Sequence, residues 1–188
     1  MPALWALAGP LRAEGFRWDL LSGYPAAHMN LTKLFTAEDL IVDFKPADKW
    51  EAISQLVDHL CEVGRIPEAA AEASRDAVLL REQSMSTGME HGIAIPHGAV
   101  DGLDEIAACM GIVGGDEGLA FESIDGGMTR LVVVLVIPRD QKLLHIRTLA
   151  DVARALGKES VRKSLEDAGS SAEAWDVLAR NEAGAKLA

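Results

Sequence analysis

The chain of 188 residues has few aromatic and cysteine residues. Aromatic side chains make up 5% of the chain, and Cys61 and Cys109 are its two cysteines. They lie far apart, within apolar segments and outside any CxxC pair, so we expect buried free thiols in a reducing, cytoplasmic compartment. The sequence also has no apolar run near the roughly 20 residues that span a bilayer. We therefore expect neither membrane insertion nor a transporter within this chain.

Positive charge is scarce as well. The chain has 18 Lys and Arg residues against 29 Asp and Glu residues, which gives a formal net charge of −11. Nucleic acids and anionic membrane surfaces are themselves negative, so this balance disfavours both as partners. Apolar residues make up 49% of the chain and charged residues 25%, which is ordinary for a globular protein. The length suits one domain with a substantial core.

The first 28 residues differ from the rest of the chain. Turn-forming residues interrupt any sustained apolar period there: Gly9, Pro10, Gly15, Gly23 and Pro25. Arg12 and Arg17 follow the apolar start instead of preceding it, which argues against a secretory signal. We therefore expect residues 1–28 to be a poorly ordered extension. The domain itself is expected over 29–182, followed by a C-terminal tail over 183–188.

Three apolar runs predict β-strands, over 40–44, 106–113 and 131–137. The last reads LVVVLVI and is the most apolar run of the chain. Both faces of such a strand must be covered, so it should be central in its sheet with helices on either side. We therefore predict the α/β class, as a single domain with a mixed β-sheet flanked by helices on both faces.

Helices are predicted over five ranges: 46–63, 67–83, 141–156, 161–168 and 172–179. The first should bury one apolar stripe, made of Trp50, Ile53, Val57 and Leu60. The second is rich in alanine and should pack closely on its neighbour through Ala70, Ala73, Ala77 and Leu80. Trp175 is expected to anchor the last helix.

The most informative segment, residues 81–98, reads REQSMSTGMEHGIAIPHG. Its β-branched run stops at Pro96, because proline cannot donate to a sheet ladder. His97 is therefore expected in a loop just past a strand end, where a scaffold exposes a reactive imidazole. Imidazole can act as a nucleophile, a general base or a metal ligand near neutral pH. Small residues nearby would let an anionic ligand come close to the backbone. They are Gly88, Gly92 and Gly98, together with Thr87.

The elements Arg81-Glu82, Thr87-Gly88 and GIAIPHG (92–98) occur in this order at a characteristic spacing. Together they resemble the enzyme IIA domains of the bacterial phosphotransferase system. The resemblance is to the mannitol/fructose type (type 2), most closely its stand-alone nitrogen-regulatory branch, and covers roughly residues 29–178. It implies the same α/β fold and a phosphotransferase activity as a histidine phosphocarrier, without a cofactor.

The resemblance also implies roles for individual residues. His97 would accept the phosphoryl group as tele-phosphohistidine, and the other nitrogen of its ring would need a carbonyl or carboxylate partner. His145 would stabilise the phosphate from the helix after the central strand. Arg81 would contact phosphate oxygens or a partner, since a guanidinium matches their geometry. The pocket that binds phosphate and partner would be shaped by Thr87, Gly88 and Gly98. The Thr87 hydroxyl would be available to a phosphoryl oxygen.

The implied donor is phosphorylated HPr or an HPr-like carrier, and the implied acceptor is a IIB component or a regulated target protein. The sequence shows no IIB, IIC or HPr-like segment, which favours the regulatory branch. A sugar-specific IIA of the fructose/mannitol type is the alternative within the family. A binding module that keeps the fold without being phosphorylated is the alternative outside it.

The resembled family usually has a glycine or another small or polar residue before the glycine that corresponds to Gly92, and His91 departs from this pattern. Together with His97, Asp101 and Asp104 it raises the hypothesis of a metal site. No recognisable zinc-ligand spacing is present, however, and two histidines around a short strand converge poorly. We therefore expect no metal.

Overall fold

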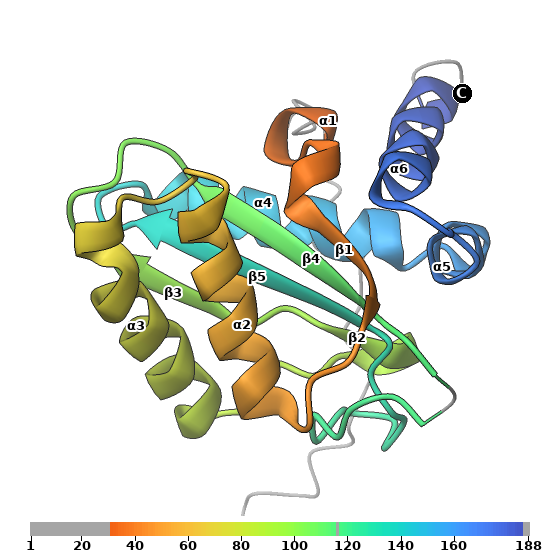
Figure 1. The fold of residues 1–188 in the computed structure, drawn as a ribbon, viewed down its shortest axis with the longest axis horizontal. Helices are drawn as coiled ribbons and strands as arrows, with labels where there is room; N and C mark the ends of the chain where they lie inside the picture. The colour runs from red at the N-terminus through yellow and green to blue at the C-terminus, as the bar shows by residue number, and fades with distance from the viewer. Residues whose placement is uncertain (1–30, 116, 186–188) are drawn as a thin grey trace, which may run out of the picture.

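The computed structural model of the chain describes residues 31–115 and 117–185; for 142–143 and 183–185 it describes the backbone alone. The predicted extension over residues 1–28 lies outside the described residues. The domain is a mixed β-sheet between two layers of helices (Figure 1). This confirms the α/β class and the mixed sheet that the sequence predicted.

The sheet contains strands β1 (Leu40–Phe44), β2 (Ile93–Ala94), β3 (His97–Val100), β4 (Ala107–Val113) and β5 (Leu131–Pro138). The order is β1-β4-β5-β2, and β3 also pairs with β5. β4 and β5 are antiparallel, while the other pairs are parallel. Every residue of β5 is buried, as expected of a central strand.

β2 and β3 behave as one edge strand with a break at Ile95 and Pro96. Ile93 pairs with Leu131 and His97 pairs with Leu135, so both pieces keep the same register on β5. The carbonyl of Pro96 still accepts from the amide of Leu135 at 2.9 Å. His97 therefore begins a strand, and the prediction of a loop position was wrong. Proline removes a donor but keeps its acceptor, which an edge strand tolerates.

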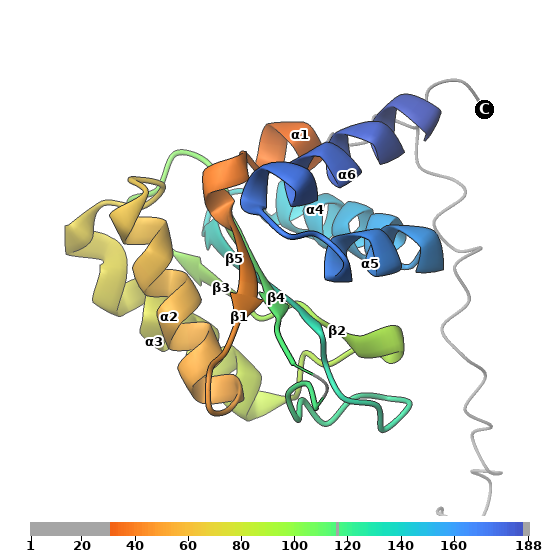
Figure 2. The ribbon, with the colours of Figure 1, turned by 45° about the vertical axis from the view of Figure 1, so that its right-hand side comes forward.

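Helices α2 (Lys49–Glu62) and α3 (Ala71–Ser84) cover one face of the sheet. The other face is covered by α1 (Leu31–Leu34), α4 (Lys142–Leu156), α5 (Glu159–Glu166) and α6 (Ser171–Ala185), as Figure 2 shows. Alternate residues of β5 belong to the two cores: Val132, Val134 and Val136 on the α2 side, and Leu131, Val133, Leu135 and Ile137 on the other. Full burial of each such side chain contributes roughly 1.5–3 kcal/mol.

Short 3-10 helices connect these elements: η2 (Ala37–Asp39), η3 (Glu68–Ala70) and η4 (Glu90–Gly92). Trp175 of α6 is half-buried, and its indole N–H donates to the Phe35 carbonyl at 3.2 Å, in keeping with its predicted anchoring role. Among the described residues, no helix is both long and apolar enough to cross a membrane.

Helix α2 differs from the prediction in detail. Asp48 caps α2 by accepting from the amides of Trp50 and Glu51, so the helix begins at Lys49 and not at Pro46. Trp50 is 37% exposed and is not part of the buried stripe.

The predicted inner face of α3 was wrong in part: Ala77 packs against the core on the α2 side, but Ala73 and Leu80 are exposed. Leu80 is 64% exposed, whereas Ser74, Val78 and Glu82 are buried. A Cβ atom on Gly98 would come within 2.7 Å of the α3 backbone at Val78, so β3 approaches this helix closely. Alanines carry too little apolar surface to fix a helix face, and this close approach fixes it instead.

Candidate functional site

The ring of His97 is oriented by a neighbouring carbonyl. Its Nδ1 lies 2.8 Å from the carbonyl oxygen of Ile95. A carbonyl oxygen can only accept, so in the neutral ring Nδ1 carries the proton and donates it. The lone pair is then on Nε2. The partner that the sequence left open is thus the Ile95 carbonyl, and Nε2 is the ring nitrogen able to act as a nucleophile.

The surroundings of His97 favour the neutral ring. Burial lowers its pKa from the ordinary value of 6.5, because an imidazolium is poorly solvated there. The charges of Arg81 and His145 lower this pKa further, while the Ile95 carbonyl acts in the opposite direction. An unprotonated imidazole is the form that can attack phosphorus.

His145, in the first turn of α4, faces His97. The two ring centroids are 5.2 Å apart, and the ring planes meet edge to face at 66°. Burial and the charge of Arg81 lower the pKa of His145. Its Nε2 is buried and has no hydrogen-bond partner among the described residues. A buried polar atom without a partner is costly, and an anion bound beside the two rings would supply one.

Arg81 completes this group from the last turn of α3. It donates to the carbonyl of Met85 at 2.8 Å. Its charge acts on the pKa of both histidines. The structure therefore brings together Arg81, His97 and His145, the three side chains expected to handle phosphate.

Thr87 and the glycines have other contacts. The Thr87 hydroxyl donates to Oε2 of Glu82 at 2.6 Å, and its amide donates to the same atom at 2.8 Å. Because a hydroxyl has one proton, Thr87 can donate to a phosphoryl oxygen only after leaving Glu82. A Cβ on Gly88 would lie 2.2 Å from the Phe121 carbonyl oxygen, and Gly98 lies against α3. Close packing thus accounts for both glycines.

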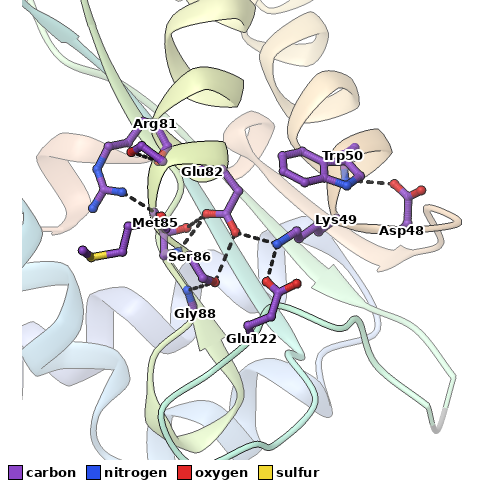
Figure 3. A network of polar contacts seen from close by, with 11 residues as sticks. Asp48, Lys49, Trp50, Arg81, Glu82, Met85, Ser86, Gly88 and Glu122 are labelled. Atoms are coloured by element: carbon purple, nitrogen blue, oxygen red, sulfur yellow. Dashed lines mark hydrogen bonds and ion pairs between the residues drawn. The ribbon is translucent and has the colours of Figure 1, made fainter.

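Sequence reasoning missed a network of polar contacts beside this site, and Figure 3 labels all of its members except Thr87. We call it the Lys49–Glu82 network, and its members are Lys49, Glu82, Ser86, Thr87 and Glu122. Glu82 is 2% exposed and Lys49 8% exposed. The Lys49 ammonium is 3.1 Å from Oε1 of Glu82 and also pairs with Glu122. Ser86 donates to the same Glu82 oxygen at 3.2 Å.

The sequence contained one signal for this network. Glu82 belongs to the Arg81-Glu82 element that supported the resemblance, yet only Arg81 received a role. Lys49 gave no signal, since a lysine at the start of a helix is usually solvated. A depression of about 390 Å³ lies over the network, lined by Lys49, Trp50, Glu82, Gln83, Ser86 and Glu122.

His91 lies apart from these residues. It is exposed, has a left-handed φ of 67°, and its amide donates to Asp125 at 2.8 Å. Within residues 31–115 and 117–185, no group of three or more His, Cys, Asp or Glu side chains converges as metal ligands would.

Comparison with known proteins gives three close points of reference. The PTS system fructose-specific EIIA component of Haloferax volcanii is 30% identical over 154 residues, which are 80% of this chain and 97% of that protein. The nitrogen regulatory protein of Klebsiella oxytoca is 36% identical over 103 residues, covering 55% of this chain and 63% of that protein. The solved complex of enzyme IIAMTL and phosphorylated enzyme IIBMTL from Escherichia coli contains a chain with a TM-score of 0.64 and 26% identity, over 77% of this chain and 96% of that one.

Some relatives are much larger. The chain spans 23% of the PTS system fructose-specific EIIABC component of Bacillus subtilis, at 28% identity over 150 residues. The sequence profile of the family described as "Phosphoenolpyruvate-dependent sugar phosphotransferase system, EIIA 2" matches residues 33–181. That range holds the sheet, most of both helical layers and the three side chains expected to handle phosphate. The chain therefore belongs to the type 2 EIIA family of the phosphoenolpyruvate-dependent sugar phosphotransferase system.

Proposed function

We propose that the protein is a phosphocarrier in which Nε2 of His97 accepts a phosphoryl group from phosphorylated HPr or an HPr-like carrier. The hydrogen bond from Nδ1 to the Ile95 carbonyl is the observation that carries this proposal, because it leaves the Nε2 lone pair free. The N–P bond forms at Nε2 while the N–P bond of the donor histidine breaks. The donor imidazole leaves with that electron pair.

The surrounding residues stabilise the charge of this transfer. Positive charge develops on the His97 ring as Nε2 bonds to phosphorus, and the Ile95 carbonyl strengthens its hydrogen bond to Nδ1–H. In this proposal the phosphoryl oxygens lie against Arg81 and against Nε2 of His145, which has no hydrogen-bond partner among the described residues. Such chemistry depends on positioning and on charge stabilisation, and the protein needs no cofactor for it.

The nitrogen-regulatory role is the form of this function that we favour. The Klebsiella oxytoca relative carries that name at 36% identity. In that role, phosphorylation adds about 1.5–2 negative charges to a protein already at −11, so a partner with an acidic surface around His97 is repelled. A sugar-specific IIA is the second candidate, because the fructose-specific relative matches over 97% of its length.

The test is phosphorylation by phosphoenolpyruvate, enzyme I and HPr. We expect an acid-labile, base-stable phosphate on the wild-type chain and none on His97→Ala, which should keep its fold. Phosphate on Ser84, Ser86 or Thr87 would contradict the assignment, and no phosphate at all would favour a binding module. Adding a fructose- or mannitol-type IIB separates the two roles, since transfer to IIB indicates the sugar-specific one.

A further inference from the structure

A continuous series of hydrogen bonds runs from α2 to the ring of His97. Lys49 donates to Oε1 of Glu82 at 3.1 Å, and Thr87 donates to Oε2 through its amide and its hydroxyl. The Thr87 carbonyl accepts from the amide of Ile95 at 3.2 Å. The Ile95 carbonyl then accepts from Nδ1 of His97 at 2.8 Å. The carbonyl that selects the ring tautomer is thus itself held, through Thr87, by Glu82.

The cost of burying Glu82 indicates that it is more than a space-filling residue. Its side chain is completely buried, and that of Lys49 is 10% exposed. Removing two charges from water is expensive, and apolar residues of similar volume often replace such a pair without loss of stability. Glu82 also follows Arg81 directly, so one helix end carries a phosphate-handling side chain and the start of this series (Figure 3).

We propose that Glu82, held in place by Lys49, is a positioning residue for phosphoryl transfer: it fixes the Thr87–Ile95 backbone so that the Ile95 carbonyl keeps the proton of His97 on Nδ1. The effect on transfer rests on the proposed function, whereas the effect on the tautomer does not. Glu82 touches neither the phosphoryl group nor the reacting nitrogen. It acts through Thr87 and Ile95.

The chain offers a matched control in Asp39. This carboxylate is also fully buried, and it accepts from the amide of Thr36 at 2.6 Å and from its hydroxyl at 2.9 Å. Its cation is Arg65, whose Nε is 2.8 Å away. Because Asp39 lies before β1, at the sheet edge opposite β2 and β3, its network does not lead to His97.

The experiment compares Glu82→Gln and Thr87→Val with Asp39→Asn and Thr36→Val. The ring ¹⁵N signals of His97 are recorded in the unphosphorylated chains, together with the initial rate of phosphorylation by phospho-HPr. In the wild type we expect the Nδ1–H tautomer. Glu82→Gln and Thr87→Val should populate the Nε2–H tautomer and lower the rate roughly tenfold or more, since small misplacements near a reacting group are costly. The Asp39 and Thr36 variants should change neither readout.

Two results would overturn the inference. One is an unchanged His97 tautomer and rate in both Glu82→Gln and Thr87→Val. The other is an equal change in the Asp39 and Thr36 variants, which would mean a general loss of stability. If Glu82→Gln fails to fold, the isosteric Thr87→Val decides alone. A wild-type chain that takes no phosphate defeats the proposed function, while the tautomer comparison still tests this inference.

Discussion

Glu82 and Asp39 show how similar local chemistry serves different ends. Each carboxylate is buried, each accepts from the amide and hydroxyl of one threonine, and each pairs with a cation from another segment. At Asp39 the threonine precedes a 3-10 helix, so the network secures a chain turn. At Glu82 the threonine leads through hydrogen-bonded backbone to His97. The two networks therefore differ mainly in the segment that follows the threonine, and little in the carboxylate itself.

Replacing His145 should give the largest difference in phosphorylation rate between a variant near His97 and a variant in the Asp39 network. His145→Ala removes the side chain that we propose faces the phosphoryl oxygens, and loss of one such donor costs roughly 10²-fold in rate. Arg65→Met, in the Asp39 network, should leave the rate unchanged. The readout is the initial rate of phosphorylation by phospho-HPr at saturating donor. Rates within twofold of each other for the two variants would contradict this prediction.

Removing the cation from each network should affect stability unequally. Lys49→Met leaves Glu82 buried without its cation, and breaking a buried pair in this way costs roughly 3–5 kcal/mol. Arg65→Met should cost less, because the Arg65 side chain is 36% exposed and water can replace it. Urea denaturation measures both free energies of unfolding. An equal or larger loss of unfolding free energy for Arg65→Met would show that the exposure of the cation does not distinguish the Lys49–Glu82 pair from the Arg65–Asp39 pair.

Arg81 should act on histidine titration, and Arg65 should not. Since the charge of Arg81 lowers the pKa of both His97 and His145, Arg81→Gln should raise both values. In the proposed function, phosphorylation needs the neutral His97 ring, so the fall in rate on acidification should begin at a higher pH in this variant. NMR titration of the ring protons measures the pKa values, and Arg65→Met is the control. Unchanged pKa values of His97 and His145 in Arg81→Gln would show that Arg81 does not belong to the site.

The same shifts predict the direction of a stability change with pH. His97 and His145 have lowered pKa values in the folded state. Between these values and the ordinary 6.5, the unfolded chain binds more protons, so the free energy of unfolding decreases as pH falls through this window. Replacing both histidines with Gln should remove this part of the decrease. Denaturation of both chains across the window measures it.

Glu122 should contribute least. Its side chain is 71% exposed, and exposed ion pairs are worth roughly 0–1 kcal/mol. Glu122→Gln should therefore change the free energy of unfolding by less than about 1 kcal/mol, because Lys49 keeps its contact with Glu82. The His97 tautomer should stay the same. A large loss of stability would make Glu122, rather than Glu82, the main partner of Lys49.

The sequence was sufficient where a residue's environment follows from its neighbours in the chain. The apolar run at 131–137 predicted a central strand, and the structure has β5 there. It was insufficient for α3, where alanines leave the buried face to be set by contact with Gly98. The role predicted for His97 remains a prediction, but its position as the first residue of β3 depended on pairing with β5 across the sheet.

The Lys49–Glu82 network could not be predicted for a related reason. Lys49 and Glu82 lie on different helices, and neither charge belongs to an apolar period. Their burial follows from the packing of α2 beside α3, which local sequence does not specify. The hydroxyl of Thr87 was expected to face phosphate, and only the three-dimensional contact with Glu82 gives it another acceptor.

The break at Pro96 also affects how this sheet meets other chains. An exposed strand edge is a template on which a second chain can add, and short edges or prolines prevent it. The outer side of β2 is already occupied, since Met89 donates to Ile93 and Ile95 donates to Thr87. β3 offers only His97–Val100, directly after a proline. Pro96, which directly precedes the proposed phosphoryl acceptor, thus also limits strand addition at this edge, as prolines and short edge strands do in general.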